Sequence, residues 1–194
     1  MAQRFKNVYQ FKITLKDSKP PIWRRIQVPE SYSFWDLHVA IQDAMGWMDY
    51  HLHLFTIPSA GSPGYIEIGI PEGNEYLKSV QEKIKDYISL EHPKLTYRYD
   101  FGDDWVHSVV LEKILPREPQ QEYPLCVAGR MACPPEDCGG IDEYYRSMDI
   151  LKDPQNEEFD FIADWFGKDY DPKQFDPRKI VFDDPSERRK MSGL

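Results

Sequence analysis

Two runs of alternating apolar and polar residues predict a pair of strands at the start of the chain. In the first run, apolar residues recur at every second position, as in a half-buried strand: Tyr9, Phe11, Ile13 and Leu15. The second run, 22–28, follows Pro20 and Pro21 after a short connection, which predicts a hairpin. Arg24 falls on its apolar face. The favoured interpretation is that the Arg24 stem packs under an aromatic ring while its head reaches an edge carboxylate, and the alternative is that it binds an anion.

Residues 33–46 carry the most regular helical pattern. Ser33 predicts the N-cap, with Asp36 three residues later, and Gly46 predicts the C-terminal stop. Apolar residues recur at helical spacing over this region: Phe34, Leu37, Ile41, Ala44, Met45 and Met48. His38 lies beside this stripe, so a hydrogen-bonded histidine at the edge of the core is favoured over a ligand.

Two histidines share the next strand pattern, which covers 51–57. Alternation places His51 and His53 on one face. Two imidazoles on one face can share a metal ion, but they can equally cap aromatic neighbours at a sheet edge. The second interpretation is favoured because the pattern supplies no third fixed ligand. Beyond this strand, 65–70 predicts another short strand, and the spacing in 72–90 is only roughly helical.

A hairpin is predicted around Gly102, because clean alternation flanks it on both sides: Leu95, Tyr97, Tyr99 and Phe101, then Trp105, His107, Val109 and Leu111. The pairing brings His107 beside the Tyr99 side of its partner strand, with Asp100, Asp103 and Asp104 near the turn. Carboxylates that converge with a histidine can hold a divalent metal and activate water. Aspartates also satisfy turn amides, and this structural interpretation is favoured.

The loop 126–140 is the other candidate site. Its thiols, Cys126, Cys133 and Cys138, lack the paired spacing of the strong zinc signatures. A structural zinc completed by His107, His51 or His53 stays open as an alternative, and no stable disulfide is expected. Glu136 and Asp137 in the same loop join the candidate binding residues.

Two further helices are predicted late in the chain. Apolar residues recur on one face after Gly140: Ile141, Tyr144, Tyr145, Met148 and Leu151. A last helix covers 159–166 and ends at Gly167. The following segment is expected to wrap around the domain, anchored by Tyr170, Phe175, Ile180 and Phe182. Residues 183–194, with the basic run 188–190, are expected to form a flexible, solvated tail.

Composition and charge narrow the class of protein. The chain has 194 residues, of which 41% are hydrophobic and 14% aromatic, enough for one folded domain over 1–182. A net charge of −9 opposes the phosphate backbone, so generic DNA binding is not expected. No window approaches the roughly 18 apolar residues that span a bilayer, and the start lacks the apolar region of a secretory signal. The sequence therefore predicts a cytoplasmic protein without a membrane partner.

Five blocks together resemble the Ri-plasmid open-reading-frame-three-like family: 20–25, 46–55, 99–107, 132–140 and 175–177. The resemblance covers about residues 7–182 and implies a single α+β domain in a family found on plasmids, mobile elements and chromosomes. Some members carry a transposon-resolvase label. That chemistry needs a nucleophile among basic residues and a cationic DNA-binding surface, and this sequence supports neither.

The sequence thus predicts an α+β fold in which a mixed or antiparallel sheet packs against the 33–45 helix, in an order compatible with a β-grasp-like arrangement. The leading hypothesis for function is a non-enzymatic binding or adaptor domain for an unknown protein or small-molecule partner, in the context of mobile DNA. The alternative is a metal-dependent hydrolase that uses zinc or another divalent metal. The candidate binding residues are Arg24, His51, His53, Asp100, Asp103, His107, Glu136 and Asp137, and the candidate metal ligands are Cys126, Cys133, Cys138 and His107.

Overall fold

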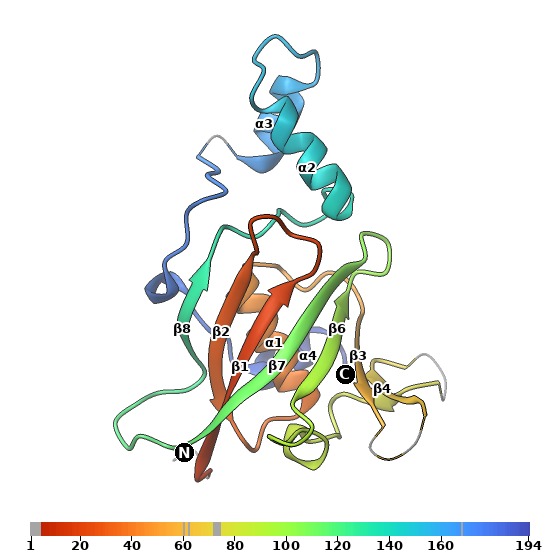
Figure 1. Ribbon diagram of the computed structural model, residues 1–194, viewed down its shortest axis with the longest axis vertical. Coiled ribbons are helices and arrows are strands. Elements are labelled where there is room, and N and C mark those ends of the chain that lie inside the picture. The colour runs from red at the N-terminus through yellow and green to blue at the C-terminus, as the bar shows by residue number, and fades with distance from the viewer. Residues whose placement is uncertain (1–4, 60, 62, 72–74, 168) are drawn as a thin grey trace.

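A computed structural model describes residues 5–59, 61, 63–71, 75–167 and 169–194. The strands of the described residues form one open sheet of eight strands in the order β5-β4-β3-β6-β7-β1-β2-β8 (Figure 1). Their bounds are β1 (Asn7–Leu15), β2 (Trp23–Pro29), β3 (His53–Pro58), β4 (Tyr65–Gly69), β5 (Leu77–Lys78), β6 (Lys94–Tyr99), β7 (Trp105–Pro116) and β8 (Leu125–Arg130). Within the described chain, β4 and β5 pair in parallel and the other neighbours are antiparallel. The predicted α+β class with a mixed sheet is confirmed.

Helix α1 (Phe34–Met45) covers one face of this sheet (Figure 1). Its start is a capping box, since the Ser33 side chain accepts from the Asp36 backbone N at 3.2 Å and the Asp36 carboxylate accepts from the Ser33 backbone N at 2.8 Å. Gly46 ends the helix with a φ of +90°, a left-handed conformation that glycine adopts without strain. The helix and both of its predicted ends are confirmed.

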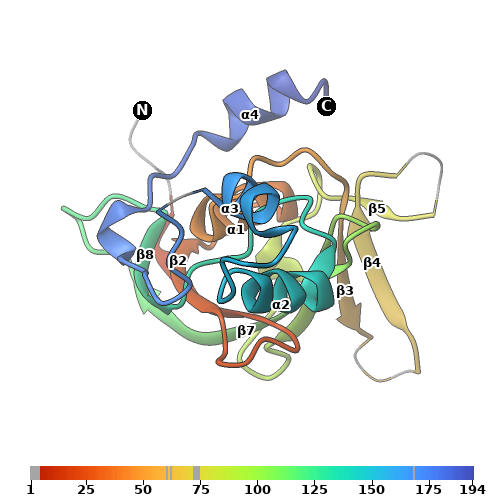
Figure 2. The ribbon, with the colours of Figure 1, turned by 90° about the horizontal axis from the view of Figure 1, so that it is seen from above.

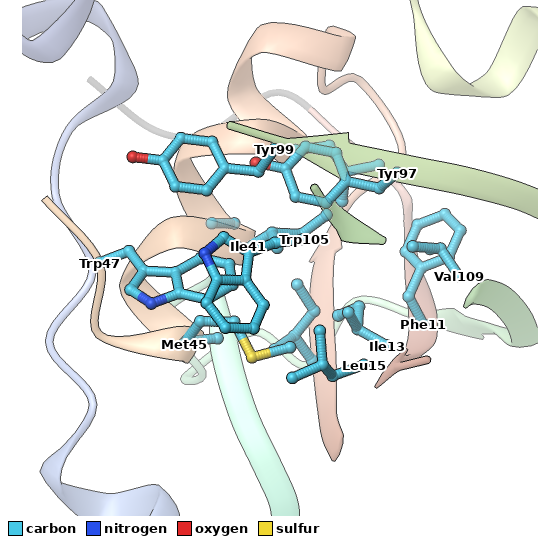
Figure 3. Close-up of a cluster of buried hydrophobic side chains, with 14 of the residues drawn as sticks. Phe11, Ile13, Leu15, Ile41, Met45, Trp47, Tyr97, Tyr99, Trp105 and Val109 are labelled. Atoms are coloured by element: carbon cyan, nitrogen blue, oxygen red, sulfur yellow. The ribbon is translucent and has the colours of Figure 1, made fainter. Parts of the chain in front are cut away.

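The core lies between α1 and the sheet. Alternate residues of the central strands point inward, toward Ile41 and Met45 on the apolar stripe of α1. Figure 3 shows these strand residues: Phe11, Ile13, Leu15, Tyr97, Tyr99, Trp105 and Val109. The β6–β7 hairpin pairs Tyr97 with His107 and Tyr99 with Trp105, so the predicted hairpin is confirmed. Because every second residue is buried in β6 and in β7 as far as Leu111, the register of the hairpin fixes which side chains reach its turn end.

Two helices stand beyond the end of the sheet at which the β6–β7 turn lies (Figure 1). They are α2 (Gly140–Ile150) and α3 (Phe159–Phe166), and Gly167 ends the second as predicted. The chain then returns along β8, and the expected anchors are partly buried against the core: Tyr170, Phe175, Ile180 and Phe182. Short 3-10 helices occur at Ile84–Asp86, within the segment of uncertain pattern, and at Pro177–Lys179. Residues 72–74 of that uncertain segment lie outside the described chain.

The C-terminal segment differs from the expected tail. Residues Pro185–Met191 form the helix α4, which packs on the side of α1 away from the sheet (Figure 2). Arg188 Nη2 donates to Asp43 Oδ1 at 2.7 Å, and the Asp183 backbone N donates to Asp43 Oδ2 at 2.9 Å. Trp35 Nε1 donates to the Pro185 carbonyl at 2.9 Å. The basic run is therefore not merely solvated, because its first residue neutralises a carboxylate on α1. Within the described chain, no helix has the length and apolar character needed to cross a bilayer.

Candidate functional site

Three segments that are distant in the sequence meet beside the end of α1. They are the segment 46–52 after α1, the β6–β7 turn, and the loop 133–139 before α2. Trp47 Nε1 donates to the Pro134 carbonyl at 2.9 Å, and the Met48 backbone N donates to Glu136 Oε2 at 2.6 Å. These bonds hold the 133–139 loop against the residues that follow α1. The loop has no regular hydrogen-bond ladder of its own, so the neighbouring segments determine its shape.

Tyr99 stands at the centre of this junction. Its ring stacks on Trp47 with centroids 5.2 Å apart, and both rings lie at the edge of the core (Figure 3). The Tyr99 hydroxyl donates to the Glu136 carboxylate and accepts from the Tyr50 backbone N at 3.0 Å. Burial, reinforced by Glu136, raises the pKa of Tyr99 well above its usual range, so the phenol stays protonated. Tyr99 therefore links the two loops that flank it.

Asp103 holds the start of α2. Its Oδ2 accepts from the Gly139 backbone N at 3.0 Å. At Gly140, whose φ is +79°, an added Cβ would lie 2.5 Å from the Asp103 carbonyl oxygen. The two backbones therefore approach as closely as only glycine permits. Asp103 and Glu136, both candidate binding residues, have their carboxylates engaged in positioning the loop.

His51, Asp100 and Asp137 form a compact group, which we call the His51 cluster. His51 Nε2 lies 2.7 Å from Asp137 Oδ1 and 3.6 Å from Asp100 Oδ2. One potential ligand atom from each of the three residues lies within 4.8 Å of the other two. The structure thus brings together three of the candidate binding residues, from three separate segments.

Asp100 is the buried member of the His51 cluster. Its side chain is only 9% exposed. Its Oδ1 accepts from the Gly102 backbone N at 2.8 Å, while Oδ2 makes no hydrogen bond with the described residues and faces His51. Asp100 and Asp137 both have left-handed backbones, with φ of +54° and +56°, a conformation that aspartate tolerates better than most residues. One imidazole nitrogen and two carboxylate oxygens are ligands that zinc and other divalent metals accept.

The other two candidate histidines lie in the core. His53 stacks on His38 with centroids 3.7 Å apart, and His107 Nδ1 lies 3.2 Å from the Trp105 carbonyl oxygen. Burial lowers the pKa of His53 well below its usual value and that of His107 to about 3, so both imidazoles are neutral. β3 begins at His53, so the predicted strand alternation does not extend to His51. Consequently, His51 and His53 do not converge on one ligand position.

Sequence reasoning missed the polar group around His38. His38 Nδ1 lies 2.8 Å from the Tyr97 hydroxyl, and its Nε2 lies 2.7 Å from Asp49 Oδ1. Gln42 Nε2 also donates to the Tyr97 hydroxyl, at 2.8 Å. The hydrogen-bonded histidine expected at position 38 is confirmed, but His38 lies in the core rather than at its edge, because its side chain is fully buried. No signal in the sequence indicated Asp49, which lies in the irregular segment after α1.

The thiols do not join the His51 cluster. Cys126, Cys133 and Cys138 are free. Burial raises the pKa values of Cys133 and Cys138 to about 12, so these thiols stay protonated at neutral pH. Among the described residues, no thiol belongs to a group of three potential metal ligands. The structure therefore does not assemble the zinc site that the three cysteines and His107 were considered for.

Arg24 has a structural position. Its Nε donates to the Ala44 carbonyl at 2.8 Å, and its Nη1 donates to the carbonyls of Trp23 and Arg130 at 3.0 and 3.1 Å. The guanidinium carbon lies 3.9 Å from the centre of the Phe175 ring. The expected aromatic partner is present, but carbonyl oxygens take the place of the expected carboxylate. Arg24 joins β2 to the last turn of α1 and to β8, away from the His51 cluster.

Comparisons with known proteins agree with the resemblance seen in the sequence. Residues 7–179 match the model of the plasmid pRiA4b ORF-3-like protein family. The uncharacterized protein y4hQ of Sinorhizobium fredii (strain NBRC 101917 / NGR234) is 32% identical over 170 residues, with 85% of this chain and 84% of that protein covered. The crystal structure of MM3350, a protein of unknown function from Methanosarcina mazei Go1, is similar with a TM-score of 0.86 and 46% identity, covering 92% of this chain and 99% of that chain. The chain belongs to the plasmid pRiA4b ORF-3-like protein family.

Proposed function

We propose that this protein is a non-enzymatic binding module and that the His51 cluster binds a divalent metal ion. The observation that carries the proposal is the convergence of His51, Asp100 and Asp137 within 4.8 Å. At ordinary zinc bond lengths, neighbouring ligand atoms of a tetrahedral site lie roughly 3.4 Å apart. The distances of 2.7 and 3.6 Å from His51 Nε2 to the two carboxylates bracket that value. Small side-chain movements would therefore bring His51 Nε2 to this separation from both carboxylates.

The surroundings of the His51 cluster support binding. Trp47, Met48 and Tyr99 fix the loop that carries Asp137, and the Gly102 backbone N fixes Asp100. Ligands held in advance by such bonds need less ordering when an ion binds. Three protein ligands leave at least one coordination position for water or for a group of a partner.

The hydrolase alternative receives less support from the same geometry. Metal-assisted hydrolysis commonly uses a further acid or base beside the metal. Two further carboxylates belong to the same junction: Glu136, which accepts from Tyr99 and the Met48 backbone N, and Asp103, which accepts from the Gly139 backbone N. Both carboxylates are occupied in holding the loop. For this reason we propose binding rather than catalysis.

Metal titration tests the proposal. Chelator-treated protein would be titrated with Zn²⁺, Mn²⁺ and Co²⁺ by calorimetry, with the visible spectrum of the Co²⁺ form reporting its coordination. We expect one ion per chain. In His51→Ala the affinity should fall by roughly 10-fold or more, because one of three ligands is lost. His92→Ala is the matched control, since His92 is exposed and outside the cluster. Equal affinity in the His51 variant and the control would refute the proposal.

A further inference from the structure

A cavity lies beside α2, at the end of the sheet where the β1–β2 turn and the last residues of β8 also lie (Figure 1). Its volume is about 720 Å³, and we call it the α2 cavity. This volume is within the range of pockets that hold small organic ligands. Among the described residues that line it, none belongs to the His51 cluster. A ligand in the α2 cavity would therefore bind independently of the proposed metal ion.

Hydrogen bonds between distant segments hold the walls of the α2 cavity together. The Tyr145 hydroxyl on α2 accepts from the Lys19 backbone N and donates to the Lys19 carbonyl oxygen, the latter at 3.2 Å. The Ala132 backbone N donates to the Pro172 carbonyl at 2.9 Å. The first two bonds join α2 to the β1–β2 turn, and the third joins the end of β8 to the segment after α3. The cavity is thus formed by the fold itself, so a ligand need not order its walls.

The buried and half-buried part of the cavity lining is largely apolar. Ile22 and Tyr144 are buried, and Met131, Met148 and Leu151 are half-buried against the core. Methionine side chains adapt to ligands of different shape. Each apolar group that a ligand places against this lining removes further apolar surface from water. The lining therefore suits an apolar ligand body.

The exposed part of the lining is positively charged. Its basic residues are Lys19, Arg130, Lys152 and Lys173. Lys152 Nζ pairs with Asp149, an acidic residue of the lining, at 2.7 Å. The other three basic side chains make no ion pair with the described residues. Three unpaired positive charges from three separate segments thus line one cavity, and all three residues are exposed to solvent.

This excess of positive charge is local, because the chain as a whole has a net charge of −9. A cationic ligand would meet three like charges, and a neutral ligand would gain nothing from them. A small inorganic anion would leave the apolar lining in contact with water. The lining therefore matches a ligand that joins a negative charge to an apolar body.

We propose that the α2 cavity binds an amphipathic monocarboxylate, a molecule in which an apolar chain or ring ends in one carboxylate. The carboxylate lies among the Lys19, Arg130 and Lys173 side chains, and the apolar body covers Met131 and Met148. The exposed cations attract the anion, while burial of the apolar body supplies most of the affinity.

Four probes test the proposal on the wild-type, metal-free protein. Octanoate has both features, octanamide lacks the charge, octylammonium reverses it, and acetate lacks the apolar chain. Calorimetry or amide chemical shifts should show saturable binding of octanoate, and added salt should weaken it because the cations are exposed. We expect octanamide to bind about 3-fold more weakly or worse, and octylammonium and acetate about 10-fold more weakly or worse. Absence of octanoate binding, or equally tight binding of any of the other three probes, would overturn the proposal.

Two double variants locate the site. Lys19→Gln/Lys173→Gln removes two of the charges and keeps the backbone bonds of Lys19, and we expect octanoate affinity to fall by about 5-fold or more. Lys94→Gln/Lys113→Gln is the matched control, because it changes the net charge equally at exposed positions of β6 and β7 outside the cavity. Octanoate affinity in this control should be unchanged. Equal octanoate affinity in the two double variants would overturn the proposed position of the carboxylate. All four lysines are exposed, so both variants are expected to fold.

Discussion

His51 Nε2 lies 2.7 Å from Asp137 Oδ1, although 86 positions separate the two residues in the chain. The contact joins the segment after α1 to the loop before α2. Both segments are irregular, so the contact depends on the bonds around Tyr99 and Glu136 that hold the loop in place. The tertiary structure therefore creates the contact between His51 and Asp137. Variants can test the proposed metal ligands separately from Tyr99 and Glu136, which support them.

The first prediction concerns the ligand role of Asp137. In Asp137→Asn, metal affinity should fall by about 10-fold or more, because an amide oxygen is a much weaker ligand than a carboxylate. Without metal, the melting temperature should stay within a few degrees of the wild type, since Asp137 is partly exposed. Asp104→Asn is the matched control: Asp104 also has a left-handed backbone, and it pairs with Arg98 outside the cluster. The checks are calorimetric titration and a thermal melt. Metal affinity that falls equally in both variants would argue against a ligand role.

The second prediction concerns Tyr99 as a structural link. Tyr99→Phe removes the hydroxyl that joins Glu136 to the Tyr50 backbone N and leaves both groups without that partner. We expect the free energy of unfolding to fall by about 1–3 kcal/mol. Tyr65→Phe is the control, because Tyr65 is largely exposed on β4, which β3 separates from β6. Urea denaturation measures both. A loss in Tyr99→Phe no larger than in the control would show that the hydroxyl does not support the loop.

The third prediction concerns the close approach at Gly140. An alanine there would place its Cβ 2.5 Å from the Asp103 carbonyl oxygen, in a backbone with a φ of +79°. We expect Gly140→Ala to lower the free energy of unfolding and to weaken metal binding, because the 133–139 loop would have to move. Gly46→Ala is the comparison: its φ is +90°, but an added Cβ would meet no atom within 4 Å. Both variants are measured by urea denaturation and by metal titration. Backbone strain affects both of them, whereas the steric clash affects Gly140→Ala alone. Metal affinity reduced equally in the two variants would contradict the steric argument.

Sequence reasoning succeeded where the determining chemistry is local. The capping box at Ser33, the glycine stop at Gly46 and the β6–β7 hairpin follow from residues a few positions apart. Alternation also identified the buried face of each central strand. It could not show that β3 begins at His53, which separates His51 from the strand face. Periodicity describes regular elements, and the His51 cluster is built where those elements end.

Local sequence patterns could not predict which charged residues pair when they are far apart in the chain. The sequence shows Arg188 only as part of a basic run, whereas the structure pairs it with Asp43 on α1 across 145 positions. Likewise, Asp49 gave no signal before α4 and His38 were placed around it. The carboxylates of Asp100 and Asp137 were recognised as candidates, but only the folded chain distinguishes them from Asp103 and Glu136, which hold the loop.

The fourth prediction concerns nucleic acid. The net charge of −9 opposes the phosphate backbone, and within the basic run Arg188 is already neutralised by Asp43 and Asp183. We therefore expect no tight binding of generic duplex DNA at physiological salt. Fluorescence anisotropy with a labelled duplex over a range of salt concentrations checks this. Tight binding with a steep salt dependence would show that a cationic surface outweighs the net charge.

The last prediction concerns His107 and pH. Its folded-state pKa is lowered to about 3 by burial, below the ordinary value of 6.5. The unfolded chain therefore binds a proton more readily, and the stability that the neutral imidazole contributes is present above pH 6.5 and lost as pH falls toward 3. In His107→Phe this loss is absent. The difference in unfolding free energy between wild type and variant should shift in favour of the variant by about 2 kcal/mol between pH 6.5 and 5.

Urea denaturation at several pH values between 5 and 7.5 measures that difference, with metal-free protein so that the His51 cluster does not contribute through bound ions. His92→Phe is the control for replacing a histidine by phenylalanine, since His92 is exposed. His107→Phe should also bind metal as the wild type does, since His107 lies in the core rather than in the His51 cluster. Parallel pH curves for all three proteins would mean that the His107 imidazole titrates alike in the folded and unfolded chain. Lost metal binding in His107→Phe with an intact fold would instead return His107 to the ligand set.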